Sequence, residues 1–178
     1  SALTFFYIQE GVDNGDIVDQ QMFKVEIFDD ASSIYDKITD LGKEMLEKNL
    51  SLLNLGHMIR KKQNEHEFIE NWPKRTPSDG KINWKFNAKE IDTLIRATTY
   101  PYPGAFTFFK NKKIIIWKST FDELTNFESG KIISVVNGIP TIGTVKGTIS
   151  FEKVSVENEI NEPEKSIFSS ADIGMKVG

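Results

Sequence analysis

The sequence contains no cysteine among its 178 residues, and this absence excludes several kinds of site at once. Disulfide frameworks, thiolate nucleophiles and cysteine-based zinc or iron–sulfur centres all require a side chain that the chain lacks. Histidine is also scarce: the two that are present, His57 and His66, lie in polar surroundings typical of solvated side chains. A chain without thiols fits a reducing compartment, so we expect a cytoplasmic location.

Long apolar runs and an excess of basic residues are missing as well. No apolar stretch approaches the roughly 18 residues that a membrane-spanning helix needs, so a membrane protein is excluded. The net charge is −4, whereas a surface that binds nucleic acid carries a clustered excess of lysine and arginine. The one short basic cluster, Arg60-Lys61-Lys62, is typical of a solvated loop, and we do not expect nucleic acid as a partner.

Hydrophobic periodicity divides the first part of the chain into strands and a helix. Ala2 to Ile8 is almost entirely apolar and is predicted to be a strand buried on both faces. Residues 17–28 are predicted to form a second strand or a strand pair. From Asp30 to Leu55 apolar residues recur three, four or seven positions apart, which indicates an amphipathic helix that ends at Gly56. A strand buried on both faces needs neighbours that this chain does not supply, so we expect a fragment of a larger α/β domain.

The rest of the chain is predicted to contain an arm, a helix and a small β-domain. Residues 57–86 are polar and interrupted by prolines, which indicates a linker arm, and a second helix is expected to begin near Asn87 and to end before Pro101. Five short strands separated by turn residues indicate a small, partly open β-barrel of the OB-like type. Their predicted ranges are 106–109, 114–118, 131–137, 141–145 and 148–156. The last residues, from 158 onward, are expected to be irregular and to end in a poorly ordered terminus.

Asp13 is the candidate catalytic residue. It belongs to the turn Gly11-Val12-Asp13-Asn14-Gly15, which directly follows an apolar strand, so a rigid element would hold its carboxylate at the edge of a cleft. The simpler alternative is an aspartate that bonds its own backbone within the turn. The spacing of Asp13, Asp16 and Asp19 lacks the ligand pattern of a calcium loop, and we predict no metal site.

A second motif begins with Lys-Arg-Thr-Pro-Ser-Asp-Gly-Lys-Ile-Asn-Trp at residues 74–84 and ends with Pro-Tyr-Pro-Gly-Ala-Phe at residues 101–106. Trp84 is a large amphipathic side chain, suited to pin the arm against a preceding domain. Two prolines fix φ on either side of Tyr102, and Gly104 permits a close backbone approach. One interpretation of these residues is domain docking. The other is that Tyr102, Pro103 and Gly104 border a substrate cleft.

Both motifs resemble those of formyltransferases that use 10-formyltetrahydrofolate, the family that contains methionyl-tRNA formyltransferase and the nucleotide-sugar N-formyltransferases. The resemblance implies an α/β plus β fold. Residues 1–56 would be the C-terminal part of a doubly wound catalytic domain, residues 57–86 the linker arm, and residues 87–178 a linker helix and an OB-like barrel. It also implies 10-formyltetrahydrofolate as the cofactor, with Gly11, Val12 and Asp13 beside it and with Asp13 orienting a catalytic histidine.

The resemblance further implies a partner and an acceptor. The family's other catalytic residues, in an Asn-x-His arrangement and a His-x-Ser-Leu-Leu-Pro-like run, are expected in the N-terminal part of the same domain and not in this chain. We therefore predict that this chain alone transfers no formyl group. Acidic residues near the C-terminus favour a nucleotide-linked aminosugar as the acceptor, and the Pro-Tyr-Pro-Gly-Ala-Phe run resembles the enzyme that formylates UDP-4-amino-4-deoxyarabinose. Methionyl-tRNA formyltransferase is the first alternative, and a non-catalytic OB-like binding module is the second.

Overall fold

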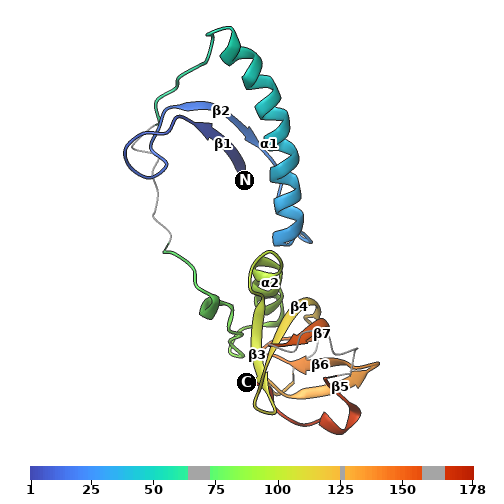
Figure 1. Ribbon diagram of the computed structural model, residues 1–178. Helices are drawn as coiled ribbons and strands as arrows, with labels where there is room; N and C mark the ends of the chain where they lie inside the picture. Colours follow the sequence, from blue (N-terminus) through green and yellow to red (C-terminus); the bar gives the residue numbers. More distant parts are fainter. Residues whose placement is uncertain (64–72, 125–126, 158–166) are drawn as a thin grey trace. The chain divides into compact units, whose positions relative to one another are not determined.

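The computed structural model describes residues 1–63, 73–124, 127–157 and 167–178 (Figure 1). The chain divides into two compact units, Ser1–Lys74 and Arg75–Gly178. Each unit has a sheet of its own, with two strands in the first unit and five in the second. Neither of the two α-helices in the described parts has the length and apolarity needed to cross a membrane.

The first unit consists of a short antiparallel sheet and one long helix (Figure 1). Strand β1 (Ala2–Phe6) pairs with β2 (Ile17–Met22), and helix α1 (Ala31–Asn54) packs on them. Asp19 of β2 fastens the helix, because its carboxylate accepts hydrogen bonds from Lys48 at 3.0 Å and from Asn49 at 2.9 Å.

Two predictions for this unit are wrong. Strand β1 is half-buried and not buried on both faces, because among the described elements it packs mainly on β2 and α1. The predicted strand 17–28 ends at Met22, because the backbone turns shortly afterwards. The N–H of Asp29 donates to the carbonyl of Glu26 at 3.1 Å, and the Asp29 carboxylate accepts from the N–H of Glu26 at 2.7 Å.

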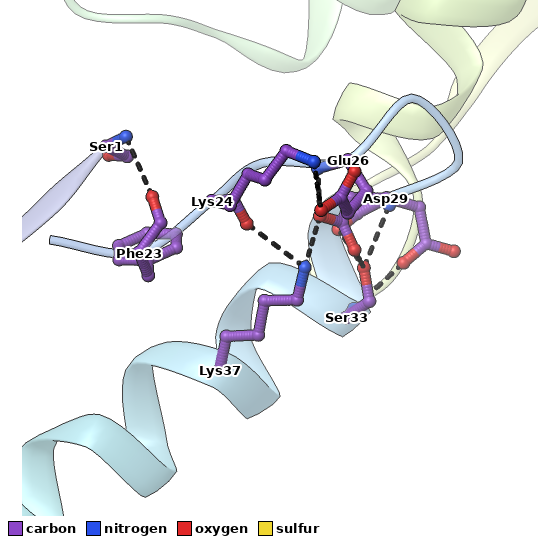
Figure 2. A network of polar contacts seen from close by, with 8 residues as sticks. Ser1, Phe23, Lys24, Glu26, Asp29, Ser33 and Lys37 are labelled. Carbon is purple, nitrogen blue, oxygen red and sulfur yellow. Dashed lines mark hydrogen bonds and ion pairs between the residues drawn. The ribbon is translucent and has the colours of Figure 1, made fainter.

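A polar network fixes the start of α1 (Figure 2). Asp30 is the N-cap: its carboxylate accepts from the N–H of Ser33 at 2.9 Å, and the Ser33 hydroxyl accepts from the N–H of Asp30 at 3.0 Å. This reciprocal capping box satisfies two backbone donors that have no partner inside the helix. Gly56, with φ +71°, follows the last turn of α1 in the left-handed conformation that a terminating glycine favours.

Asp29 gives this network a measurable dependence on pH. Its side chain is 9% exposed, and the ammonium of Lys37, together with the N–H of Glu26, lowers its pKa from 3.8 to about 2. A carboxyl group whose pKa is lower in the folded state stabilises the fold above its unfolded pKa, and this contribution disappears as the pH falls through the folded value. Stabilisation of the helix start should therefore be lost between about pH 4 and pH 2.

An NMR titration of the Asp29 carboxyl carbon checks this prediction. The midpoint is expected at about 2 in the wild type and closer to 3.8 in Lys37→Ala, because the ammonium is then absent. Lys43→Ala removes another lysine of α1 that pairs with Asp40 at 3.2 Å, and it should leave the midpoint unchanged. Equal midpoints in the wild type and in Lys37→Ala would show that Lys37 does not control the Asp29 pKa.

The second unit is built on a five-stranded antiparallel sheet with the strand order β3-β4-β7-β6-β5 (Figure 1). The strands are β3 (Ala105–Phe109), β4 (Lys112–Asp122), β5 (Ile132–Val136), β6 (Ile139–Gly143) and β7 (Thr148–Val156). All five predicted strands are confirmed within a few residues. The predicted turn positions Asn111, Asn137, Gly138 and Gly147 all have positive φ, which lets short connections reverse the chain.

Helix α2 (Ala88–Thr98) packs on this sheet and contributes to its core. Asn87 caps it, because its side chain accepts from the N–H of Glu90 at 2.9 Å while the Glu90 carboxylate accepts from the N–H of Asn87 at 2.9 Å. Ile91 and Ile95 of the helix are fully buried against isoleucines and phenylalanines of the sheet. Each such side chain stabilises the fold by roughly 1.5–3 kcal/mol relative to exposure. The second unit therefore has a complete core.

The C-terminal residues connect the two end strands of the sheet. The N–H of Gly178 donates to the carbonyl of Phe108 on β3 at 2.8 Å, and the N–H of Ile132 on β5 donates to the carbonyl of Met175 at 2.9 Å. The predicted OB-like barrel is not confirmed, because β3 and β5 do not pair with each other in the described residues. The prediction of a poorly ordered terminus is wrong, since Val177 is 4% exposed and packs into the core.

A short 3-10 helix, η3 (Ser170–Asp172), fastens this terminal segment. The Asp172 side chain is 3% exposed and lies 2.6 Å from the ammonium of Lys110 in the turn between β3 and β4. The hydrogen bond from Lys110, and those from Ser169, lower the pKa of Asp172. The carboxylate thus holds the end of the chain against the β3–β4 turn.

Candidate functional site

Asp13 lies in the exposed loop between β1 and β2. Its φ is +51°, in the left-handed region that aspartate tolerates better than most residues. Its carbonyl accepts a hydrogen bond from the Gln63 side chain at 2.8 Å. Its carboxylate forms no hydrogen bond or ion pair with any residue that the structure describes. The alternative of an aspartate that bonds its own turn is therefore not what the described residues show.

The backbone of this loop is held tightly, although the Asp13 carboxylate has no partner among the described residues. A Cβ built on Gly15 would lie 1.6 Å from the carbonyl oxygen of Tyr7, so no other residue fits at this position. The N–H of Tyr7 donates to the carbonyl of Asp16 at 2.9 Å, and the Gln63 side chain bridges the carbonyls of Asp13 and Gly15. The loop therefore presents an acceptor on a fixed support, as a positioned functional carboxylate requires.

The other residues predicted at the cofactor lie beside Asp13 in the same loop. Gly11 has φ +114°, and the side chain of Val12 is 90% exposed. Arg60 lies in an exposed loop, as predicted, with its guanidinium 3.8 Å from the ring centre of Tyr7 and 3.9 Å from Asp16. The basic cluster thus supports the base of the loop.

Tyr102 and Pro103 line a pocket of about 590 Å³ within the second unit. Three segments form its walls: the arm with its 3-10 helix η2 (Pro77–Gly80), the last turns of α2, and the turn before β3. The lining residues are Arg75, Thr76, Pro77, Asp79, Gly80, Leu94, Ala97, Thr98, Tyr102 and Pro103. Tyr102 and Pro103, which one of the two interpretations places at a substrate cleft, thus line a pocket.

Gly104, predicted with Tyr102 and Pro103, is not among the residues that line the pocket. A Cβ built on Gly104 would be 2.4 Å from Cγ2 of Ile115, and one built on Gly80 would be 2.6 Å from the carbonyl oxygen of Gly104. Two glycines thereby bring the arm into backbone contact with the start of β3. The hydroxyl of Thr99 donates to the carbonyl of Trp117 at 2.9 Å and ties the turn to β4.

Sequence reasoning did not find most of the pocket lining. Thr76-x-x-Asp79 is a capping box with Pro77 at its first helical position, and this signal could have predicted η2. Leu94, Ala97 and Thr98 are spaced three and four residues apart, so they share one face of α2. That this face meets the arm and the turn is a tertiary property that neither pattern contains.

Trp84 has a different role from the one predicted. Its indole N–H donates to the hydroxyl of Thr107 at 3.2 Å, and its ring centroid lies 6.3 Å from that of Phe151. Nearby, the N–H of Ile82 donates to the carbonyl of Phe106 at 2.8 Å. The tryptophan therefore pins the arm to the sheet of the second unit, and the expectation that it docks on the preceding domain is corrected.

The structure describes one of the two histidines. His57 is exposed, in agreement with its interpretation as a solvated side chain, and His66 lies outside the described residues. Asn64-Glu65-His66 does have the Asn-x-His spacing, so the expectation that this spacing is missing from the chain is wrong. These three residues also lie outside the described ranges, and no role is assigned to them.

The first unit has an apolar groove of about 440 Å³ between β1 and α1. Phe5 and Phe6 line one side, and leucines of α1 line the other. Leu46 and Leu53 are 51% and 55% exposed, and within the described part of this unit Ala31 and Met45 are the buried hydrophobic residues. The described part of the first unit thus exposes an apolar groove while it buries few hydrophobic side chains.

Comparison with known proteins identifies the family. Residues 74–171 match the model described as formyl transferase, C-terminal domain, and this segment is more than half of the 178 residues. The chain belongs to this formyltransferase family. It is 35% identical over 158 residues to the bifunctional polymyxin resistance protein ArnA of Wigglesworthia glossinidia brevipalpis, covering 88% of this chain and 22% of ArnA. It is 32% identical over 155 residues to methionyl-tRNA formyltransferase of Alkaliphilus oremlandii, covering 86% and 49%.

Solved structures share the fold. HypX from Aquifex aeolicus, in complex with tetrahydrofolic acid, aligns with a TM-score of 0.71 at 19% identity and covers 88% of this chain and 27% of HypX. An N-formyltransferase from Helicobacter canadensis, in complex with folinic acid and dTDP-3-aminofucose, aligns with a TM-score of 0.55 at 23% identity, covering 84% and 54%. Of the two curated relatives above, the chain spans about a fifth of the length of ArnA and about half of the length of the methionyl-tRNA formyltransferase.

Proposed function

We propose that this chain is the C-terminal portion of an enzyme that transfers a formyl group from 10-formyltetrahydrofolate to the amine of a nucleotide-linked aminosugar. The family match over residues 74–171 carries the proposal. The ligands named for the Helicobacter canadensis enzyme support both the folate and the sugar nucleotide. Methionyl-tRNA is the alternative acceptor, because a methionyl-tRNA formyltransferase is among the curated relatives, but the net charge of −4 favours the smaller acceptor.

The loop that carries Asp13 has residues of the kind that suit a folate. Ile8 and Val12 are 96% and 90% exposed, so their apolar side chains are available to pack on a flat pterin ring. The free carboxylate of Asp13 is an acceptor for N–H groups, which both a pterin and an imidazole carry. When bound, 10-formyltetrahydrofolate supplies the formyl carbon, and Gly11, Val12 and Asp13 are the residues of this chain that would hold it.

In the proposed mechanism Asp13 acts through a histidine of the preceding polypeptide. A carboxylate beside an imidazole raises the pKa of the imidazole, and the protonated ring would then donate a hydrogen bond to the oxygen of the formyl group. Asp13 is therefore a positioning residue. Its carboxylate would accept a hydrogen bond from one ring nitrogen and so favour a proton on the other ring nitrogen. The rigid loop backbone and the unpaired carboxylate fit this role.

The N-terminal part of the same catalytic domain is the partner that the first unit requires. A two-stranded sheet is at best marginally stable alone, and the groove between β1 and α1 exposes apolar side chains. Further strands beside β1, with helices of their own, would cover this face. We therefore propose that residues 1–56 complete a doubly wound domain whose other elements precede them in the whole protein.

A formylation assay tests the proposal. The chain joined to its preceding sequence should formylate a UDP-linked or dTDP-linked aminosugar when 10-formyltetrahydrofolate is supplied, and the 178-residue chain alone should transfer none. Asp13→Asn in the joined protein should lower kcat by about 100-fold or more with a smaller change in KM, because an amide does not stabilise an imidazolium. Glu10→Gln changes a neighbouring exposed carboxylate and is the matched control.

Three outcomes would contradict parts of this proposal. Turnover by the isolated chain would show that it carries a complete catalytic set. Equal kcat values for Asp13→Asn and Glu10→Gln would remove Asp13 from the mechanism. Formylation of methionyl-tRNA without formylation of the aminosugar would establish the alternative acceptor.

A further inference from the structure

The pocket of the second unit is formed entirely by residues of that unit, so its binding properties belong to this chain. Its volume of about 590 Å³ lies within the range of roughly 300–1,000 Å³ that is usual for small-molecule sites. A nucleoside with its phosphates is of suitable size for such a space. The chemistry of the walls indicates which part of a ligand lies where.

Half of the lining residues are apolar or aromatic. Pro77 of the arm, Leu94 and Ala97 of α2, and Pro103 of the turn present hydrocarbon surface, and Tyr102 adds an aromatic ring. Flat apolar surfaces of this kind suit a planar ring such as a pyrimidine base.

Two lining residues carry charge, and they differ in availability. The Asp79 carboxylate is occupied, because it accepts from the N–H of Thr76 at 2.6 Å and from the Thr76 hydroxyl at 3.1 Å, and these bonds lower its pKa. Arg75 forms no hydrogen bond or salt bridge with a described residue, although its positive charge contributes to the lowered pKa of Asp79. A guanidinium presents a planar fork of donors that matches phosphate oxygens bidentately. Because hydrogen bonds from Thr76 already occupy the Asp79 carboxylate, Arg75 is the charged lining residue whose N–H donors are available to an anion.

The walls are preformed. Gly80 and Gly104 bring the arm and the turn into backbone contact, and the N–H of Gly104 donates to the carbonyl of Thr98 at 2.8 Å. Thr99 ties the same turn to the carbonyl of Trp117. A ligand entering this pocket therefore loses little affinity to ordering of the protein.

We propose that this pocket binds a pyrimidine nucleoside diphosphate, with the base against the apolar wall and the diphosphate at Arg75. The identity of the ligand rests on the proposed function, in which the acceptor is a nucleotide-linked aminosugar. The pocket then holds the nucleotide part of the acceptor, and Arg75 is a specificity-determining residue that distinguishes a charged sugar nucleotide from a neutral sugar.

An NMR titration of the 178-residue chain with UDP and dTDP tests the proposal, with uridine and inorganic pyrophosphate as partial probes. The diphosphates are expected to shift amide signals of residues 75–80 and 97–103. Arg75→Ala should weaken UDP binding by roughly 10- to 100-fold, the usual range for a lost charge-assisted hydrogen bond, and should leave uridine binding unchanged. Lys74→Ala removes an equal charge from the neighbouring residue, which does not line the pocket, and should weaken UDP binding less than about 2-fold.

A second variant separates the pocket from the surrounding surface. Ala97→Phe places a bulky side chain at an exposed position of the pocket wall, so it should abolish binding of UDP and uridine while thermal unfolding remains close to wild type. The proposal is overturned if the diphosphates shift no signals at millimolar concentration, if Arg75→Ala and Lys74→Ala weaken binding equally, or if pyrophosphate alone binds as tightly as UDP. Formyl transfer is measured separately in the joined protein, so failure of one test is distinguishable from failure of the other.

Discussion

Replacing Gly147 by alanine is expected to lower the free energy of unfolding of the second unit by about 4 kcal/mol, the sum of backbone strain and overpacking. Gly147 lies in the turn between β6 and β7 with φ +84°, and a Cβ built there would be 2.1 Å from the carbonyl oxygen of Asp122. The neighbour is backbone, so no side-chain rotation relieves the contact. The carbonyl of Gly147 also accepts from the N–H of Thr144 at 3.0 Å, which resists displacement of the turn.

Gly174→Ala is the matched control for this prediction. Gly174 has φ +90°, nearly the same as Gly147, but its built Cβ has nothing within 4 Å. It should cost only about 1 kcal/mol, the penalty of a left-handed alanine. Urea unfolding followed by tryptophan fluorescence measures both variants, and Gly147→Ala should also lower the Tm by on the order of 20 °C. Equal losses in the two variants would show that the contact with Asp122 is not the cause.

The second large effect is expected at an ion pair within α2 whose carboxylate also accepts a hydrogen bond from the sheet. The Asp92 side chain is 6% exposed, and its two oxygens accept from Nε of Arg96 at 2.8 Å and from the hydroxyl of Ser119 at 2.8 Å. Arg96→Ala leaves a buried carboxylate with one of these donors removed. We expect this variant to lose about 3 kcal/mol of stability, as is usual when one partner of a buried pair is removed.

Asp92→Ala should cost less, about 2 kcal/mol, because Arg96 is 26% exposed and its guanidinium can turn to water. The double variant should be less destabilised than the sum of the two single variants, and a double-mutant cycle measures the difference. Lys113→Ala breaks the more exposed pair with Glu157 and should cost less than about 1 kcal/mol. If Arg96→Ala costs no more than Lys113→Ala, burial of Asp92 does not determine the energy of the pair.

The elements that the sequence predicted well are those whose signals are local. Helix α2 begins at Ala88 because Asn87 and Glu90 cap it within one turn, and α1 ends beside Gly56 for an equally local reason. The strands of the second unit are separated by residues that accept positive φ. Such features depend on residues that are neighbours in the chain, so hydrophobic periodicity and the residue types of turns are sufficient to predict them.

The elements that the sequence did not predict depend on contacts between distant residues. Residues 23–28 alternate as a strand would, but the Asp29 carboxylate captures the N–H of Glu26 and turns the chain. By its chemistry alone, Trp84 is suited to pack on either unit. Its observed position depends on a hydrogen bond to Thr107, which follows it by 23 residues. The pocket is assembled from three separate segments, so only Tyr102 and Pro103, which carry a family motif, were predicted there.

The arm and the terminal segment also affect how the second unit meets other molecules. Ile82 donates to the outer border of β3, as Gly178 does, and the segment around Met175 lies along the outer border of β5. A strand of another molecule is prevented from pairing with these borders, because segments of this chain already occupy them. Such edge pairing is the first event in the formation of many fibrils. Strand β1 of the first unit pairs with β2 alone among the described strands, so its other border is the place where pairing with a foreign strand should begin.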